Sequence, residues 1–334
     1  MKMKTGSSTS ITDVPGIEVG QAQDDSALTG CTVILCRKGA VAGVDVRGSA
    51  PGTRETDLLD PVNLVDKAHA ILLAGGSAYG LDAAGGVMKY LEEKRIGFNT
   101  GAARVPIVPA AILFDLGVGR ADIRPDAEMG YRACLAASRA APAEGNVGAG
   151  TGASVGKLFG ASLALKSGLG SVSLDPGSGI VVGAIVAVNA FGDVLENGKI
   201  IAGLRSGKVG PLHVGGKEYF ADTFEILKKP IGRGVLNFAT HTNTVIGVVA
   251  TNAALTKVQA TKVAQMAHDG LARVIRPAHT MLDGDTIFAL STGNKKCDVT
   301  TIGAFAAEAM AQAIVRAVKM SASAGGLPGI KDLQ

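Results

Sequence analysis

The sequence predicts an α/β layered domain, because strand-like and helix-like segments alternate along the chain and several strands are apolar on both faces. A sheet that is buried on both sides needs helices or a second sheet packed against each face. The chain has 334 residues, of which 47% are hydrophobic and 19% are charged, and this composition is typical of a globular protein. Because no internal repeat or Pro/Ser-rich linker divides it, we expect a single domain over residues 1–334.

Short apolar runs separated by glycine turns make up the first third of the chain. Three of these runs predict strands: Cys31–Cys36, Ala40–Val46 and Ala70–Ala74. The next segment has apolar residues at helical spacing and predicts a helix: Leu81, Ala84, Met88 and Leu91. A second helix is predicted over about residues 127–140, and strands follow at residues 171–174 and 180–188.

The last third of the chain has the clearest pattern. Thr244–Thr251 (TVIGVVAT) is an apolar run that predicts a buried strand, and Asp285–Ser291 predicts another. Between them, Thr256 opens a helix, and Gln259 completes a capping box three residues later. The apolar face of that helix comprises Val263, Met266, Ala267, Leu271 and Val274. A long final helix is indicated by Ile302, Phe305, Ala309, Ala313 and Ala317.

Charge and aromatic content make nucleic acid an improbable partner. The formal net charge of +4 is too small to require a polyanion, and the chain has no Trp and few Phe or Tyr residues to stack on bases. One stretch is richer in basic residues, and its glycines and Pro230 predict a solvated, loop-rich connection instead of a binding surface. Its basic residues are Lys199, Arg205, Lys208, Lys217, Lys228, Lys229 and Arg233.

Cysteine usage and apolar stretch length predict a cytoplasmic protein. The cysteines form no Cys-x-x-Cys pair, and residues 1–13 are polar without an apolar core, so we expect free thiols and no secretory signal. The four cysteines are Cys31, Cys36, Cys134 and Cys297. The apolar stretch at residues 180–188 is too short to cross a bilayer, and we expect no membrane partner.

Several familiar motifs are present only in incomplete form. Gly148–Ala153 has dinucleotide-binding spacing but follows no strand, so a structural glycine loop is favoured. Ser77 lies in GGSAYG, where Tyr79 replaces the last glycine of a serine-hydrolase elbow, and we expect a turn into the following helix. The histidines show no zinc-binding spacing, and His268 is expected to be an ordinary hydrogen-bonded core residue. The five histidines of the chain are His69, His213, His241, His268 and His279.

Two short segments place reactive groups next to apolar strands. In HTMLDGD, at residues 279–285, Asp283 and Asp285 flank a glycine immediately before a strand. Such a pair binds a hard cation, caps a turn or orients a nucleophile, and on the residues alone a turn cap is favoured. The other segment is Asn243-Thr244, which opens the TVIGVVAT strand, although Thr at a strand start is usually only a good β former.

Taken together, these segments resemble the L-aminopeptidase/D-esterase family, which includes β-peptidyl aminopeptidases and the nylon-oligomer (6-aminohexanoate-oligomer) hydrolase. Several long blocks occur in the family's order and cover nearly the whole chain. They are DVPGIEVG at 13–20, LLAGGSAYGLDAAGGV at 72–87, VGAGTGASVGK at 147–157, VVGAIVAVN at 181–189, HTNTVIGVVATNAAL at 241–255 and HTMLDGDTIFALSTG at 279–293.

The resemblance implies an N-terminal-nucleophile hydrolase with an αββα four-layer sandwich fold. In such families the precursor cleaves itself once, and the new N-terminal Ser or Thr becomes the nucleophile. The family's scissile position falls on Asn243–Thr244, which gives an α chain of residues 1–243 and a β chain of residues 244–334. The implied substrates are small peptides or oligomers of ω-amino acids. The implied assembly is a homo-oligomer, commonly a tetramer of αβ units, and no cofactor or metal is expected.

The same resemblance assigns roles to further residues. Asp283 and Asp285 match the two carboxylates of the nylon-oligomer hydrolase, whereas the aminopeptidase branch has Ser at the first position. Asn189 matches the family's oxyanion-hole asparagine, and Lys157 matches a catalytic lysine at the end of the glycine loop. Phe114, in AAILFDLG, occupies a substrate-binding position where the nylon-oligomer enzyme has a Tyr, so one phenolic hydroxyl contact is missing here.

A free α-amine on Thr244 explains how the chemistry proceeds without a histidine. An unperturbed α-amine has a pKa of about 7.7–8.0, so it is able to take the hydroxyl proton near neutral pH. We expect Asp283, Asp285 and Lys157 to orient Thr244 and Asn189 to stabilise the oxyanion. Two alternatives stand beside this hypothesis: an uncleaved small-molecule-binding or assembly protein, and a metal-dependent hydrolase built on Asp283 and Asp285.

Overall fold

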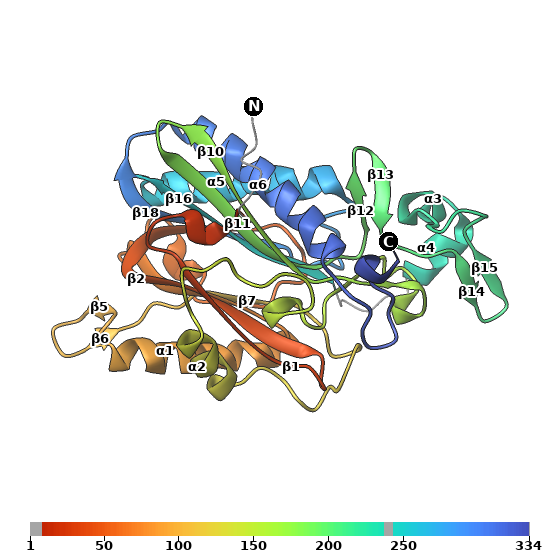
Figure 1. The fold of residues 1–334 in the computed structure, drawn as a ribbon, viewed down its shortest axis with the longest axis horizontal. Coiled ribbons are helices and arrows are strands. Elements are labelled where there is room, and N and C mark those ends of the chain that lie inside the picture. The colour runs from red at the N-terminus through yellow and green to blue at the C-terminus, as the bar shows by residue number, and fades with distance from the viewer. Residues whose placement is uncertain (1–8, 237–242, 334) are drawn as a thin grey trace.

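Two sheets lie face to face between two layers of helices in the computed structural model, which describes residues 9–236 and 243–333 (Figure 1). One sheet carries helices α5 (Lys257–Val274) and α6 (Val299–Lys319) on its outer face. The other carries α1 (Ala83–Glu93) and α2 (Ala127–Leu135). This arrangement confirms the expected αββα four-layer sandwich.

The sheet beneath α5 and α6 contains the strand that begins at Thr244. Its strands, in spatial order, are β10 (Leu169–Gly177), β11 (Ile180–Asn189), β16 (Thr244–Ala253), β18 (Thr286–Lys295) and the second half of β2 (Thr29–Val46). β16 and β18 run parallel, and the other neighbours are antiparallel. A parallel pair needs a crossover, and helix α5 supplies it between β16 and β18.

The second sheet is built on the first half of β2. Its other strands are β1 (Glu18–Asp24), β4 (Lys67–Ala74), β7 (Ala110–Ile112) and β3 (Thr53–Arg54). The runs 31–36 and 40–46 are confirmed as strand, but they form one continuous element, because β2 runs through both and belongs to both sheets. The pairing of β2 with β4 shifts register between Leu35 and Ala40, where Gly39 has a φ of +74°. A glycine takes that conformation without a steric penalty, so the chain bends there without ending the strand.

A hydrophobic cluster fills each interface between layers. Between the two sheets lie Ile34, Leu73, Ile185, Ile246 and Phe288. Between the first sheet and its helices lie Val249, Leu271, Ile287, Met310 and Ile314. Between the second sheet and its helices lie Leu72, Val87, Leu91, Met129 and Ala133. Strands covered on both faces explain why the apolar runs in the sequence are continuous instead of alternating.

Strand alternation decides which way the first residue of β16 points. Val245 and Val249 pack toward the helices, whereas Ile246 and Val248 pack between the sheets. Since successive side chains alternate faces, Thr244 belongs to the inter-sheet side. In β11, Ile185 and Ala187 also face the inter-sheet layer, which places Asn189 on that same side.

The long helices begin where the sequence predicts. Thr256 caps α5, its hydroxyl accepting from the Gln259 N–H while the Gln259 side chain accepts from the Thr256 N–H, so the predicted capping box is confirmed. The predicted end of α2 at residue 140 is wrong, because the helix stops at Leu135 and Ser138 then pairs with Val19 of β1. Helix α6 is long and apolar enough to cross a membrane by length and composition alone, but its apolar face packs on α5, β10 and β11.

The basic stretch that we expected to be loop-rich contains regular structure. It includes β13 (Lys199–Ala202), which pairs with β12 (Asp193–Glu196), and the hairpin of β14 (Gly207–Val209) and β15 (Leu212–Val214). Two short helices follow, α3 (Thr223–Leu227) and α4 (Pro230–Leu236). The remaining short strands are β5 (Phe98–Asn99), β6 (Arg104–Val105), β8 (Ser154–Val155), β9 (Leu165–Lys166) and β17 (Ile275–Arg276).

Candidate active site

Thr244 lies at the start of β16, buried between neighbouring strands. Its side chain is on the inter-sheet side, and its Oγ1 hydrogen-bonds to the carbonyl oxygen of the preceding residue, Asn243. That same carbonyl oxygen accepts a second hydrogen bond, 2.9 Å long, from the backbone N–H of Gly284. The carbonyl between Asn243 and Thr244 is therefore polarised by a backbone donor and touched by the adjacent hydroxyl.

Asn189 is the cross-strand partner of Thr244. β11 and β16 are antiparallel, and their register places Asn189 directly opposite Thr244. Directly opposite residues share a face of the sheet, with Cβ atoms about 4.5–5.5 Å apart. The pairing of two central strands thus places Asn189 and Thr244 opposite each other on the same face of the sheet.

Lys157 holds the Asn189 side chain from the glycine-loop side. Lys157 Nζ donates to Asn189 Oδ1 at 2.7 Å and to the Asn189 carbonyl at 3.0 Å. Asn189 Oδ1 also accepts from the Ser154 N–H at 3.1 Å, and Asn189 Nδ2 donates to the Phe114 carbonyl at 2.9 Å. Phe114 therefore contacts the cluster through its backbone, while its side chain is partly exposed.

Asp285 anchors the strand that carries Thr244. Its Oδ1 accepts from the N–H of Val245 at 2.8 Å. Its Oδ2 accepts from His279 twice, from the backbone N–H at 3.1 Å and from Nδ1 at 2.8 Å. The Asp285 carbonyl in turn accepts from the N–H groups of Arg47 and Gly48, which follow β2. Asp285 therefore joins β16, β18 and the end of β2.

Asp283 caps the turn that precedes Asp285. Its Oδ2 accepts from the backbone N–H and the hydroxyl of Thr280, and its Oδ1 lies 3.4 Å from the N–H of Phe191. The turn cap that the residues alone favoured is thus present. The same carboxylate also faces Lys157, whose ammonium group interacts electrostatically with it.

Burial shifts the pKa values of these groups toward neutrality. Lys157 keeps some exposed surface along its side chain, but its ammonium group is enclosed, and burial lowers the pKa of Lys157 to about 7 against the opposing pull of Asp283 and Asp115. Burial and the neighbouring Asp285 carboxylate raise the pKa of Asp283 to about 6. Groups with such pKa values exchange protons near neutral pH, which is a property of catalytic sites.

The five residues predicted to be catalytic therefore meet in one cluster, together with the Asn243–Thr244 bond. Sequence reasoning missed the groups that hold it together. The Gly284 N–H acts through the backbone, and His279 was noted only for lacking metal-site spacing. His268 is buried on α5 with Nε2 3.0 Å from the Asp45 carbonyl oxygen, as expected of a core histidine, and His241 lies outside the described residues.

Lys166 is a second buried lysine that the sequence analysis overlooked. It is fully buried, and its Nζ donates to the carbonyls of Ser167 at 2.7 Å and Ala153 at 2.8 Å. A third carbonyl, that of Gly150, lies at 3.4 Å, so Lys166 ties together the glycine loop that leads to Lys157. Burial lowers the pKa of Lys166 to about 7, opposed by Asp115. A lone lysine inside the otherwise uncharged stretch SLALKSGLGS was the only signal.

Removing Lys166 is expected to flatten the pH dependence of stability. Burial lowers the Lys166 pKa from its ordinary value of 10.5 to about 7, so the unfolded chain binds more protons between these values. The free energy of unfolding therefore rises with pH across that window, by about 1.4 kcal/mol per pH unit for one such group.

Urea unfolding of wild type and Lys166→Met between pH 7.5 and 9.5 measures this slope. We expect Lys262→Met, at an exposed site on α5, to keep the wild-type slope. Equal slopes for wild type and Lys166→Met would contradict this prediction.

The incomplete motifs have structural roles. Gly148–Gly150 forms a short 3₁₀ helix, and the N–H groups of Gly148 and Ala149 donate to side chains of β1 and β2, namely Gln23 and Thr32. These donors bind protein instead of a phosphate, in agreement with a structural glycine loop. Ser77 opens the turn Ser77–Asp82 that leads into α1, as expected.

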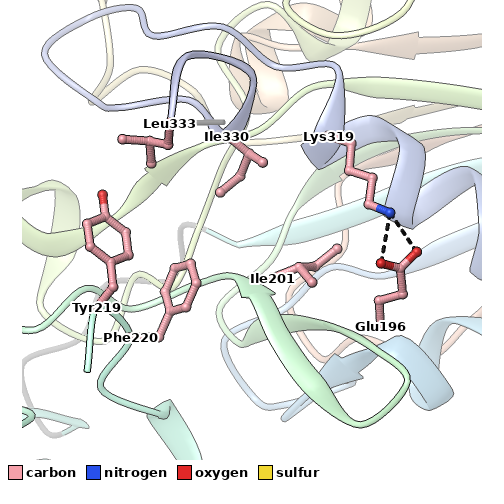
Figure 2. A pocket seen from close by; sticks show the side chains of 7 residues that line it. All are labelled: Glu196, Ile201, Tyr219, Phe220, Lys319, Ile330 and Leu333. Carbon is pink, nitrogen blue, oxygen red and sulfur yellow. Dashed lines mark hydrogen bonds and ion pairs between the residues drawn. The ribbon is translucent and has the colours of Figure 1, made fainter.

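An apolar pocket of about 560 Å³ has a lining that includes none of the catalytic cluster (Figure 2). It is bordered by the β12–β13 hairpin, the end of α6 and the C-terminal segment, and the Lys319–Glu196 ion pair closes one end. Its lining residues are Glu196, Ile201, Tyr219, Phe220, Lys319, Ile330 and Leu333. None of them is a predicted site residue.

Comparisons with known proteins agree with this architecture. Residues 9–331 match the model of peptidase family S58. The chain is 44% identical to an uncharacterized aminopeptidase of Mycobacterium tuberculosis over 97% of both chains. It is 31% identical to the 6-aminohexanoate-oligomer endohydrolase of a Kocuria species, over 94% of this chain and 87% of that enzyme.

Solved structures show the same fold. The L-aminopeptidase D-Ala-esterase/amidase of Ochrobactrum anthropi, whose fold is a variant of the Ntn-hydrolase fold, aligns with a TM-score of 0.68 at 18% identity, over 98% of this chain and 91% of that one. A β-aminopeptidase from a Burkholderia species aligns with a TM-score of 0.65 at 24% identity, over 99% and 94%. The chain therefore belongs to peptidase family S58, and it is a hydrolase of peptide or amide bonds.

Proposed function

We propose that this hydrolase cleaves its own Asn243–Thr244 bond and then uses Thr244 as an N-terminal nucleophile. The observation that carries the proposal is the environment of the Asn243 carbonyl. Its oxygen accepts from the Gly284 N–H at 2.9 Å, and the Thr244 hydroxyl hydrogen-bonds to the same oxygen. A polarised carbonyl beside a hydroxyl is the starting arrangement for an acyl shift from nitrogen to oxygen.

Maturation then follows from these contacts. Thr244 Oγ1 bonds to the Asn243 carbonyl carbon, and the Gly284 N–H stabilises the negative charge that develops on the carbonyl oxygen. The carbon–nitrogen bond breaks, and the proton lost by the hydroxyl ends on the departing Thr244 nitrogen. Water hydrolyses the resulting ester, which releases the Asn243 carboxylate and restores the Thr244 hydroxyl.

Substrate hydrolysis reuses the same cluster, and the base is now the free α-amine of Thr244. The new α-amine of Thr244 takes the hydroxyl proton as Oγ1 attacks the substrate carbonyl. Asn189, directly opposite on β11, directs its amide toward the oxyanion, and Lys157 and Ser154 hold that side chain in place. Asp285 fixes the start of β16 through the Val245 N–H, while Asp283 faces Lys157. The amine then returns the proton to the leaving nitrogen, and water releases the acyl group.

The substrate class is a small peptide or an oligomer of an ω-amino acid. Support comes from the relatives, which include both aminopeptidases and an enzyme that hydrolyses 6-aminohexanoate oligomers. Phe114 brings no hydroxyl to the site, so we expect a substrate preference different from that of an enzyme with Tyr there. A comparison of the hydrolysis rates of amino acid p-nitroanilides and of 6-aminohexanoate oligomers distinguishes exo-acting from endo-acting hydrolysis.

Denaturing mass spectrometry of the purified protein tests self-cleavage directly. We expect two chains that meet between Asn243 and Thr244, the smaller comprising residues 244–334. Activity is expected to persist with a chelator present. A single chain that stays intact on prolonged incubation would overturn the proposal and favour an uncleaved binding or assembly protein. A tetramer of αβ units in the cytoplasm remains a prediction.

A further inference from the structure

His279 and His268 form a paired cluster next to the catalytic residues without belonging to the predicted set. His279 lies in the turn before Asp285, and His268 lies on α5. Their rings meet edge to face, with centroids 4.8 Å apart and planes at 72°. The titratable groups around them are Asp285 and Asp45, with Asp45 contributed by β2 and itself paired with Arg47.

His279 supplies two of the three hydrogen bonds described for the Asp285 carboxylate. Its backbone N–H and its Nδ1 both donate to Oδ2, while Oδ1 receives the Val245 N–H. With Oδ2 as the acceptor of both hydrogen bonds, Nδ1 carries the hydrogen. The orientation of Asp285, and through it the backbone adjoining Thr244, therefore depends on where the His279 ring lies.

The backbone at His279 is held in an unusual conformation. Its φ is +55°, in the left-handed region that a residue with a Cβ seldom adopts. Such a conformation is strained for a residue with a Cβ and persists only where the surroundings enforce it. Here it lets one residue direct both its N–H and its ring to the same carboxylate oxygen.

His268 keeps the His279 ring from turning away. It is fully buried, and its Nε2 lies 3.0 Å from the Asp45 carbonyl oxygen, so Nε2 carries the hydrogen. The His268 ring is thus fixed between α5 and β2, and it packs edge to face with the ring of His279. A chain of contacts runs from α5 through His268, His279 and Asp285 to the Val245 N–H.

We propose that His279 is a positioning residue, whose ring orients Asp285 and so holds Thr244 in place for both self-cleavage and substrate hydrolysis. This inference rests on the proposed function. His279 touches neither the scissile bond nor the Thr244 hydroxyl among the described contacts, so it acts through Asp285. A displacement of about 1 Å at a reacting centre costs on the order of 10²-fold in rate.

Three substitutions at His279 distinguish its ring from its backbone. His279→Ala removes the ring, and His279→Gly also removes it but adopts a φ of +55° without strain. His279→Asn keeps an N–H donor the same number of bonds from the backbone as Nδ1, and Asn tolerates positive φ. We expect the alanine and glycine variants to cleave themselves and to hydrolyse substrate about 10²-fold more slowly, through kcat with little change in KM. The asparagine variant is expected to recover to within about threefold of wild type.

Self-cleavage is followed by mass spectrometry during cell-free synthesis, and hydrolysis with an amino acid p-nitroanilide. Thermal unfolding of each variant shows whether it is folded, and His213→Ala, at an exposed site on β15, is the matched control. Wild-type rates in the glycine or alanine variant would overturn the positioning role while leaving the proposed function intact. An asparagine variant as slow as the glycine variant would also overturn it. A wild-type chain that never cleaves would instead remove the proposed function on which the inference rests.

Discussion

Thr244→Ala is expected to yield one intact chain of 334 residues without hydrolase activity. The alanine has no oxygen to attack the Asn243 carbonyl, so neither the ester nor the free α-amine can form. Loss of the nucleophile in a hydrolase reduces kcat by on the order of 10⁶-fold. Denaturing mass spectrometry and a p-nitroanilide assay on the same preparation measure both effects.

Two controls separate the hydroxyl from the general effect of a substitution in β16. Thr244→Ser keeps the oxygen and is expected to cleave at the same bond. Thr251→Ala alters a buried threonine near the other end of the strand, where its hydroxyl accepts from the Ala253 N–H, and it is expected to mature normally. An alanine variant at position 244 that still yields a chain starting at residue 244 would refute the assignment of the nucleophile.

Asn189→Ala is expected to lower the rate of substrate hydrolysis by about 10²–10³-fold, the usual cost of losing one oxyanion donor. The alanine removes the amide beside Thr244, and it also leaves Lys157 Nζ and the Ser154 N–H without the oxygen that they contact. The effect should fall mainly on kcat, because the donor acts on charge that develops only in the transition state. Steady-state kinetics on a p-nitroanilide provide the measurement.

Asn189→Asp tests whether the amide hydrogens or the side-chain shape matter. Aspartate retains an oxygen for Lys157 but has no N–H to donate, so we expect it to be about as slow as alanine. Asn294→Ala, at an exposed position of β18, serves as the control and should retain full activity. Full activity in the aspartate variant would show that Asn189 does not stabilise the oxyanion.

The core elements could be predicted because their signals are local. The apolar run from Thr244 and the Thr256–Gln259 capping box each lie within a few residues, and both are present in the structure. The continuity of β2 across Gly39 could not be predicted, because it depends on partners more than twenty residues away, in β4 and β18. The end of α2 is set in the same way by pairing with β1.

Some residues of the candidate site could be assigned from the sequence, and others could not. Thr244, Asn189, Lys157, Asp283 and Asp285 were assigned through the family resemblance, and the structure gathers them around the adjoining ends of β11, β16 and β18. His279, Lys166 and the Gly284 N–H were not assigned. Their contributions depend on hydrogen-bond geometry and on backbone donors, and neither has a characteristic residue pattern. A buried lysine such as Lys166 is recognisable only once its three carbonyl partners are seen.

The central place of β16 has a consequence for the cleaved protein. Across the sheet the order is β10, β11, β16, β18 and β2, so the strands of residues 244–334 lie between strands of residues 1–243. The two products of the proposed cleavage would therefore be interleaved subunits, and dilution could not part them without dismantling this sheet. We expect them to unfold in one cooperative transition and to separate only under denaturing conditions. The sheet that carries Thr244 is complete in neither product, so the proposed cleavage requires both to be made as one precursor chain.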